Sequence, residues 1–220
     1  MGEFITLSAA DGHKFSAWWS PPQGKPRAGL VVIQEIFGVN SHIRDVTDRL
    51  AHEGYLAVAP ALFDRVARNY ETGYSEEEIA KSRELMGKVD WDKVQLDVEA
   101  TRASLASLGS TGIVGFCFGG SVTWVAAARL KFNAAVSYYG SAIPRFIQER
   151  PNCPTILHFG TQDQGIPQST VDQIRAAHPK VPVFMYEAGH GFACDQRASF
   201  NQVARDEAWK RTLAHFGKFL

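Results

Sequence analysis

The stretch Ile113-Val114-Gly115-Phe116-Cys117-Phe118-Gly119-Gly120 predicts a sharp turn between a buried strand and a helix. An apolar pair leads into the turn, and a helix is expected from Ser121 to Arg129. The glycines two positions either side of the cysteine allow a backbone so tightly bent that a neighbouring Cβ would clash. We therefore take this turn as the centre of a strand–helix fold.

On both sides of the turn, short apolar runs alternate with amphipathic stretches of helical period. Strands are expected at residues 4–9, 14–19, 30–33, 55–59, 113–114, 134–139, 155–159 and 183–186. Ser41 is expected to cap one helix, Ser75 to open a second, and further helices are expected over 91–108, 121–129, 169–177 and 202–219. The first two strands flank a turn-rich segment and predict an antiparallel hairpin. The later alternation predicts a mostly parallel twisted α/β sheet with helices on both faces, in a single domain over residues 1–220.

The composition narrows the functional classes. The chain has 220 residues, of which 45% are hydrophobic, and it carries 23 basic and 23 acidic side chains. This balance gives no general attraction to nucleic acid or to an anionic membrane. No apolar run approaches the roughly 20 residues that span a bilayer, and the odd number of cysteines is untypical of a disulfide framework. We expect a cytoplasmic protein, a monomer or weak homo-oligomer, that acts on a small molecule.

Three residues in the predicted strand-end loops suggest acyl-transfer chemistry. Cys117 would stand on the turn at a helix N-terminus, which favours a thiolate, with the backbone N–H of Phe118 directed at a reacting carbonyl. Asp163 and His190 follow later strands, in the order nucleophile, acid, histidine that α/β-hydrolases use. Taken singly, a buried structural cysteine, a helix-capping or turn-forming aspartate and a loop histidine remain open interpretations. Together they predict a catalytic triad.

The chain resembles the dienelactone hydrolase family along nearly its whole length. The similar stretches are Gln34–Asn40, Gly54–Phe63, Gly115–Gly120, Tyr138–Gly140, Gly160–Asp163 and Gly189–Phe192. The resemblance implies a single-domain α/β-hydrolase fold and a carboxylic ester hydrolase of the carboxymethylenebutenolidase type. Such an enzyme would open a dienelactone or another enol lactone, or cleave a related ester, through an acyl-thioester on Cys117, in aromatic degradation.

The resemblance also implies roles for the segment around Glu35. In the family the matching glutamate contacts the resting cysteine, helps to keep it neutral and turned away, and releases it when substrate binds. An ionised carboxylate beside a thiol does disfavour the thiolate. The backbone N–H of Ile36 or Phe37 is expected to serve as the second oxyanion donor, after that of Phe118.

The sequence departs from the family at the arginines that bind the substrate carboxylate. Cys194 stands at one of those positions, and Arg83 is the only arginine near the other. Arg83, Tyr139, Cys194 and Arg197 are therefore candidate substrate-binding residues only, since a bidentate arginine is hard to replace.

Two other functions stay open: a general carboxylesterase or thioesterase on the same triad, and a non-enzymatic thiol sensor or binding module. The histidines lack metal-ligand spacing, and we expect no metal and no organic cofactor.

Overall fold

The computed structural model describes residues 2–220, and it confirms the predicted α/β class. Eight strands are hydrogen-bonded in the order β1-β2-β4-β3-β5-β6-β7-β8. Contacts between residues divide the chain into two compact units, Met1–Gly112 and Ile113–Leu220. The assignment of a single domain stays a prediction.

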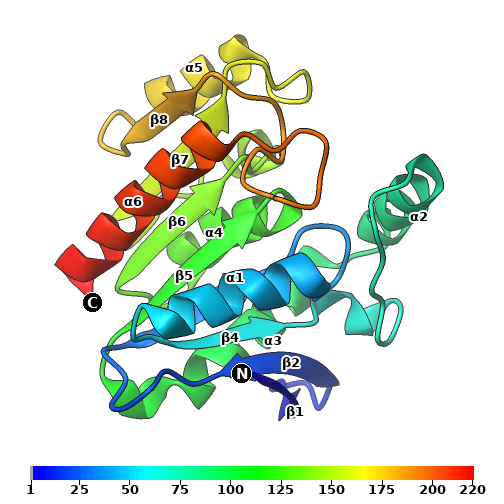
Figure 1. Cartoon of the computed structure of the whole chain (residues 1–220), viewed down its shortest axis with the longest axis vertical. Helices are drawn as coiled ribbons and strands as arrows, with labels where there is room; N and C mark the ends of the chain where they lie inside the picture. Colours follow the sequence, from blue (N-terminus) through cyan, green and yellow to red (C-terminus); the bar gives the residue numbers. More distant parts are fainter. Residues whose placement is uncertain (1) are drawn as a thin grey trace. The chain divides into compact units, whose positions relative to one another are not determined.

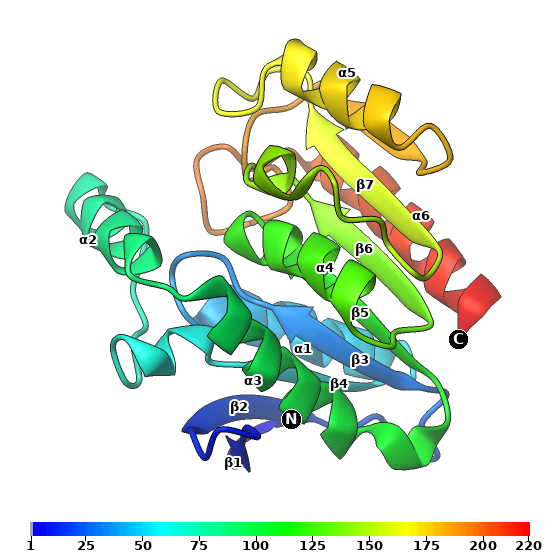
Figure 2. The same cartoon turned by 180° about the vertical axis from the view of Figure 1, so that it is seen from behind.

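The first unit is a four-stranded part of the sheet between two helices. Its elements are β1 (Glu3–Ser8), β2 (Lys14–Ser20), β3 (Gly29–Ile33), α1 (Ser41–His52), β4 (Leu56–Pro60), α2 (Glu76–Gly87) and α3 (Trp91–Ser104), with short 3-10 turns at Leu62–Arg65 and Ala106–Leu108. As predicted, β1 and β2 form an antiparallel hairpin, and β3 runs parallel to β4. β3 and β4 are buried throughout because α1 and α3 cover opposite faces of these strands (Figures 1 and 2).

Helix boundaries in this unit follow the capping side chains. Asn40, and not the predicted Ser41, caps α1 by accepting a hydrogen bond from the backbone N–H of Ile43 at 3.3 Å. The amide side chain of Asn40 reaches that N–H because its own backbone is still extended. Ser75 caps α2 as expected, in a reciprocal capping box with Glu78. The helix predicted over 91–108 ends at Ser104 and continues as the 3-10 turn.

The second unit contains the predicted sharp turn and the strands that follow it. Its elements are β5 (Thr111–Phe116, which begins two residues before the unit), α4 (Phe118–Arg129), β6 (Ala134–Tyr138), a 3-10 turn (Ile143–Phe146), β7 (Thr155–Gly160), α5 (Gln168–Ala177), β8 (Val183–Tyr186) and α6 (Gln202–Phe219). β6, β7 and β8 are parallel neighbours. Helices α4 and α6 lie on opposite faces of these strands (Figures 1 and 2).

Helix α4 begins three residues earlier than its sequence pattern indicates, since Cys117 itself is the N-cap. Its first turn carries no amphipathic signal because all of its residues from Phe118 to Gly120 are buried. Within residues 2–220, we find no helix with both the length and the apolar character that crossing a membrane requires.

Candidate active site

Cys117 occupies a strained backbone conformation between β5 and α4. Its φ is 54° and its ψ is −114°, a region that a residue with a side chain enters at a cost of about 1–3 kcal/mol. Two hydrogen bonds hold it there. The Cys117 N–H donates to the carbonyl of Tyr138 on β6 at 3.0 Å, and the N–H of Ser121 donates to the Cys117 carbonyl at 3.2 Å. In a strand and helix start that are otherwise buried, Cys117 alone is partly exposed.

The glycines of this turn are required by close backbone approach. A Cβ on Gly115 would lie 2.1 Å from the carbonyl oxygen of Gly119, and one on Gly120 would lie 2.3 Å from that of Tyr138. Neither contact can be relieved by moving a flexible side chain, since both partners are backbone atoms. The predicted reason for the flanking glycines, steric exclusion of Cβ, therefore holds at Gly115, and Gly120 is a further position of the same kind.

Asp163 is fixed in the loop after β7. Its Oδ1 accepts hydrogen bonds from the backbone N–H groups of Gly165 (2.9 Å) and Ile166 (3.2 Å). Its Oδ2 accepts one from Nδ1 of His190 at 2.7 Å. The aspartate side chain is fully buried. One carboxylate oxygen thus anchors the residue, and the other orients the imidazole.

The loops that carry Asp163 and His190 are joined by backbone hydrogen bonds. The N–H of Gln162 donates to the carbonyl of Ala188 at 3.0 Å. Gly160 permits this approach, because a Cβ there would lie 2.1 Å from the same carbonyl oxygen. The relative position of the acid and the base is therefore set by main chain rather than by flexible side chains.

His190 hydrogen-bonds with both of the other predicted triad residues. Since its Nδ1 faces Asp163, Nε2 is the ring nitrogen left for its hydrogen bond with Cys117. Burial lowers the pKa of His190, but the negative charge of a Cys117 thiolate and the hydrogen bonds to Asp163 and Cys117 outweigh it and raise that pKa from 6.5 to about 10. At neutral pH His190 therefore holds its proton beside Cys117.

Tyr139 packs beside the imidazole. Its ring centroid is 5.0 Å from that of His190, in a tilted arrangement, and 5.3 Å from that of Phe192, in an edge-to-face arrangement. Its φ of 38° is in the left-handed region, and its N–H donates to the carbonyl of His158 at 2.8 Å. Because Tyr139 is fully buried, it supports His190 as a packing residue.

The other predicted site residues lie in different places. Glu35, Ile36 and Phe37 follow β3 in the first unit and are buried, whereas Arg83 is exposed on α2. In the second unit, Cys194 is fully buried and Arg197 is partly exposed. Arg197 packs against the turn after His190, since a Cβ on Gly191 would lie 2.5 Å from its Nη1.

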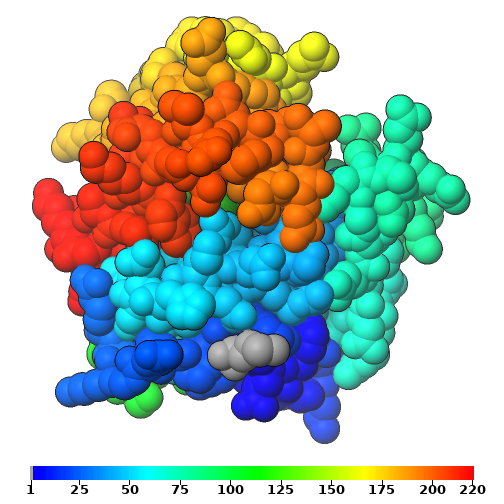
Figure 3. Space-filling view, viewed as in Figure 1, coloured from blue at the N-terminus to red at the C-terminus, as the bar shows by residue number. Residues whose placement is uncertain are grey.

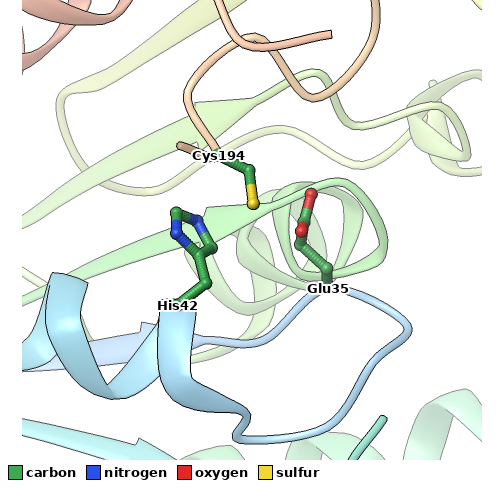
Figure 4. A group of neighbouring side chains, drawn as sticks. All are labelled: Glu35, His42 and Cys194. Carbon is green, nitrogen blue, oxygen red and sulfur yellow. The ribbon is translucent and has the colours of Figure 1, made fainter. Parts of the chain in front are cut away.

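Figure 4 shows Glu35, His42 and Cys194 as neighbouring side chains, all buried. Each offers one atom of a type that binds metal ions. Because Glu35 and His42 belong to the first unit and Cys194 to the second, we assign no metal to the three.

Two features of the site were missed from the sequence. Asp163-Gln164-Gly165 is typical of a turn in which an aspartate bonds the backbone two residues on, and this signal could have identified the anchoring of Oδ1. The left-handed backbone of Tyr139 carries no such signal, since tyrosine rarely adopts it.

Comparison with known proteins gives concordant findings. A model of the dienelactone hydrolase family matches residues 15–220. A Synechocystis sp. protein provisionally named carboxymethylenebutenolidase is 40% identical over 207 residues, covering 85% of this chain and 84% of the relative. The carboxymethylenebutenolidase of Pseudomonas putida is 33% identical over 222 residues, covering 96% and 94%. A crystal structure from Klebsiella pneumoniae, provisionally described as a dienelactone hydrolase, superposes with a TM-score of 0.88 at 31% identity and covers 100% and 99%.

Proposed function

Because the chain belongs to the dienelactone hydrolase family and is a carboxylic ester hydrolase, we propose that it opens an enol lactone such as a dienelactone. In this proposal Cys117 is the nucleophile, His190 the acid and base, and Asp163 the residue that orients His190. The observation that supports it is the hydrogen bonding of His190 to both Cys117 and Asp163, three residues that follow the carboxyl ends of β8, β5 and β7.

The first step is acylation. The Cys117 thiolate attacks the lactone carbonyl, and the backbone N–H of Phe118 at the first position of α4 stabilises the oxyanion. The tetrahedral intermediate then expels the ring oxygen, which takes the proton of the His190 imidazolium. The products of this step are an acyl-thioester on Cys117 and an enol that tautomerises to a ketone.

Acylation also prepares the second step. Once the sulfur is esterified, it carries no negative charge, and the attraction that keeps His190 protonated is lost. His190 therefore remains neutral after it has given up its proton. A neutral imidazole held by Asp163 accepts a proton from water, and the resulting hydroxide equivalent hydrolyses the thioester.

The segment after β3 has two proposed roles, which rest on the family resemblance. Glu35 would restrain the resting thiol, and the backbone N–H of Ile36 or Phe37 would be the second oxyanion donor. The hydrogen bond between Cys117 and His190 supports the proposed transfer of the thiol proton to the imidazole. Replacing Glu35 with glutamine would test the restraint: the rate of thiol alkylation without substrate should rise.

Arg197 is the best-placed candidate for a substrate carboxylate, since its guanidinium packs against the turn that carries His190. Arg197→Gln should raise KM for a lactone bearing a carboxylate much more than for its neutral methyl ester. Equal effects on both substrates would remove Arg197 from substrate recognition. Arg83, Tyr139 and Cys194 carry no comparable observation.

A general carboxylesterase or thioesterase on the same triad is the competing function. We propose a small-molecule substrate, no cofactor and a cytoplasmic location, as the sequence predicts.

The deciding experiment compares turnover of cis-dienelactone with that of a panel of enol, alkyl and thioesters, using the wild type, Cys117→Ala and Cys153→Ala. Cys153 is the matched control, because it is the other partly exposed cysteine of the second unit. Fast opening of the dienelactone that is lost only in Cys117→Ala would support the proposal. Preference for simple esters, again lost in that variant, would favour the competing function, and activity that persists in Cys117→Ala would refute the triad.

A further inference from the structure

A pocket lies in the second unit, at the strand ends opposite to those that carry Asp163 and His190. Asp163 and His190 follow the carboxyl ends of β7 and β8, whereas this pocket lies at their amino ends, beside the last turns of α6. The six residues of β7 place about 17 Å between the two ends. The pocket has a volume of about 600 Å³ and is lined by Pro151, Cys153, Pro154, Thr155, Ile156, Lys180, Val181, Pro182, Phe184, Arg211, Ala214, His215, Lys218 and Phe219.

The lining combines an apolar floor with a cationic rim. Ile156, Phe184 and Phe219 supply hydrocarbon surface, and Lys180, Arg211 and Lys218 supply positive charge. No aspartate or glutamate is among the lining residues that the structure describes. This combination is complementary to a molecule that is apolar over most of its length and carries one negative group.

The two lysines have no counter-charge of their own. Within residues 2–220, neither Lys180 nor Lys218 forms an ion pair, and both side chains are exposed. Lys218 lies over the ring of Phe219, with its Nζ 5.1 Å from the centroid. In Figure 3 the last turns of α6, drawn in red, form part of the molecular surface. A carboxylate at this rim would therefore meet ammonium groups that are still available to it.

Arg211 is held rigidly between the rim and the floor. It pairs with Glu207 at 2.9 Å, donates to the hydroxyl of Tyr186 at 3.0 Å and stacks over Phe184 at 4.5 Å. Its charge is partly neutralised by Glu207, so the lysines are the main attraction for an anion. Nearby His215 donates from Nε2 to the carbonyl of Pro154 at 3.1 Å and adds no charge, since burial and Lys218 lower its pKa.

We propose that this pocket binds a free amphipathic monocarboxylate, a hydrocarbon chain or ring system of about ten carbon atoms ending in one carboxylate. The hydrocarbon lies on the floor between β7, β8 and α6, and the carboxylate lies between Lys180 and Lys218. The volume suits a ligand of this size, since pockets for small molecules commonly measure about 300–1,000 Å³. The proposal does not depend on the function assigned to the triad.

The test is calorimetric titration of the full chain with decanoate, with decanol as the uncharged analogue. We expect saturable binding of decanoate at one site and binding of decanol at least about tenfold weaker. Lys180→Ala and Lys218→Ala should each weaken decanoate binding by about three- to tenfold. Added salt should reduce this difference in affinity between the wild type and the variants. Lys210→Ala is the matched control, since Lys210 is exposed on α6, the helix that carries Lys218, and does not line the pocket.

A second variant separates this pocket from the active site. Ala214 lines the pocket and is exposed, so Ala214→Trp fills the groove without disturbing the core, and Ala176→Trp on α5 is its control. Loss of decanoate binding in Ala214→Trp alone supports the proposal. Binding that survives Ala214→Trp, binding insensitive to both lysine substitutions, or association with anionic phosphatidylglycerol vesicles without binding of free decanoate would overturn it.

Discussion

Replacing Cys117 with serine is expected to lower the pKa of His190 from about 10 to about 7. A thiolate and an imidazolium about 3.5 Å apart attract each other by about 5 kcal/mol at an effective dielectric constant of about 20. Since one pKa unit corresponds to about 1.4 kcal/mol, loss of the thiolate removes about three units. The hydrogen bond that His190 donates to Asp163 remains in the variant and keeps the pKa from falling far below its ordinary value of 6.5.

The assay is an NMR titration of the imidazole ring nitrogens between pH 5 and 11. The seven histidines are distinguished by comparison with His190→Gln. In the wild type, the ring of His190 should stay protonated at pH 8, whereas in Cys117→Ser it should lose its proton near pH 7. Cys153→Ser serves as the control and should leave the titration of His190 unchanged.

Two results would refute this reasoning. A wild-type His190 that titrates near 6.5 would mean that no thiolate–imidazolium pair exists in the resting protein. An unchanged pKa near 10 in Cys117→Ser would mean that Asp163 alone raises it, and the proposed neutralisation of His190 after acylation would then fail.

Three further outcomes follow from the same geometry. Because the pKa of His190 is raised, its protonated form persists above pH 6.5 and is lost only as the pH rises through about 10; the alkaline limb of kcat/KM should fall there. Asp163→Asn should lower kcat by about 10³–10⁴-fold with little change in circular dichroism, since an amide facing Nδ1 favours the wrong tautomer. Gly160→Ala should reduce the free energy of unfolding by about 1–3 kcal/mol in urea titrations and also lower kcat, because the new Cβ meets the Ala188 carbonyl at 2.1 Å. Gly87→Ala, where the added Cβ has open space, should change neither.

Local patterns in the sequence were sufficient for the α/β class and for the placement of most elements. The hairpin of β1 and β2, the buried β3 and the strand β8 lie where hydrophobic periodicity predicts them, because burial imposes a period that each segment carries by itself. Two local details were wrong: the cap of α1, which is Asn40 rather than Ser41 and depends on a single side chain, and the start of α4, which depends on the strained residue Cys117. Hydrophobic periodicity predicts neither a capping side chain nor a strained backbone.

The triad candidates could be named from order and position, since strand ends of a parallel sheet meet at one edge. The structure brings Cys117, Asp163 and His190 within hydrogen-bonding reach, and their catalytic roles remain proposals. The close approach of Gly160 to Ala188 could not be read from the sequence, because it depends on how two loops from different strands are spaced.

The amino-acid sequence by itself determined which segments form strands and helices and where a nucleophile could stand, since these depend on neighbours along the chain. Only the tertiary structure decided which residues that are distant in the sequence contact one another. Tyr139 packs against His190, although the two are far apart in the sequence. Lys180 and Lys218, which are also distant in the sequence, line the same apolar pocket. Such contacts depend on the order of the strands and on the packing of helices on the sheet. Strand order and packing arise from the summed burial of many residues rather than from any local pattern.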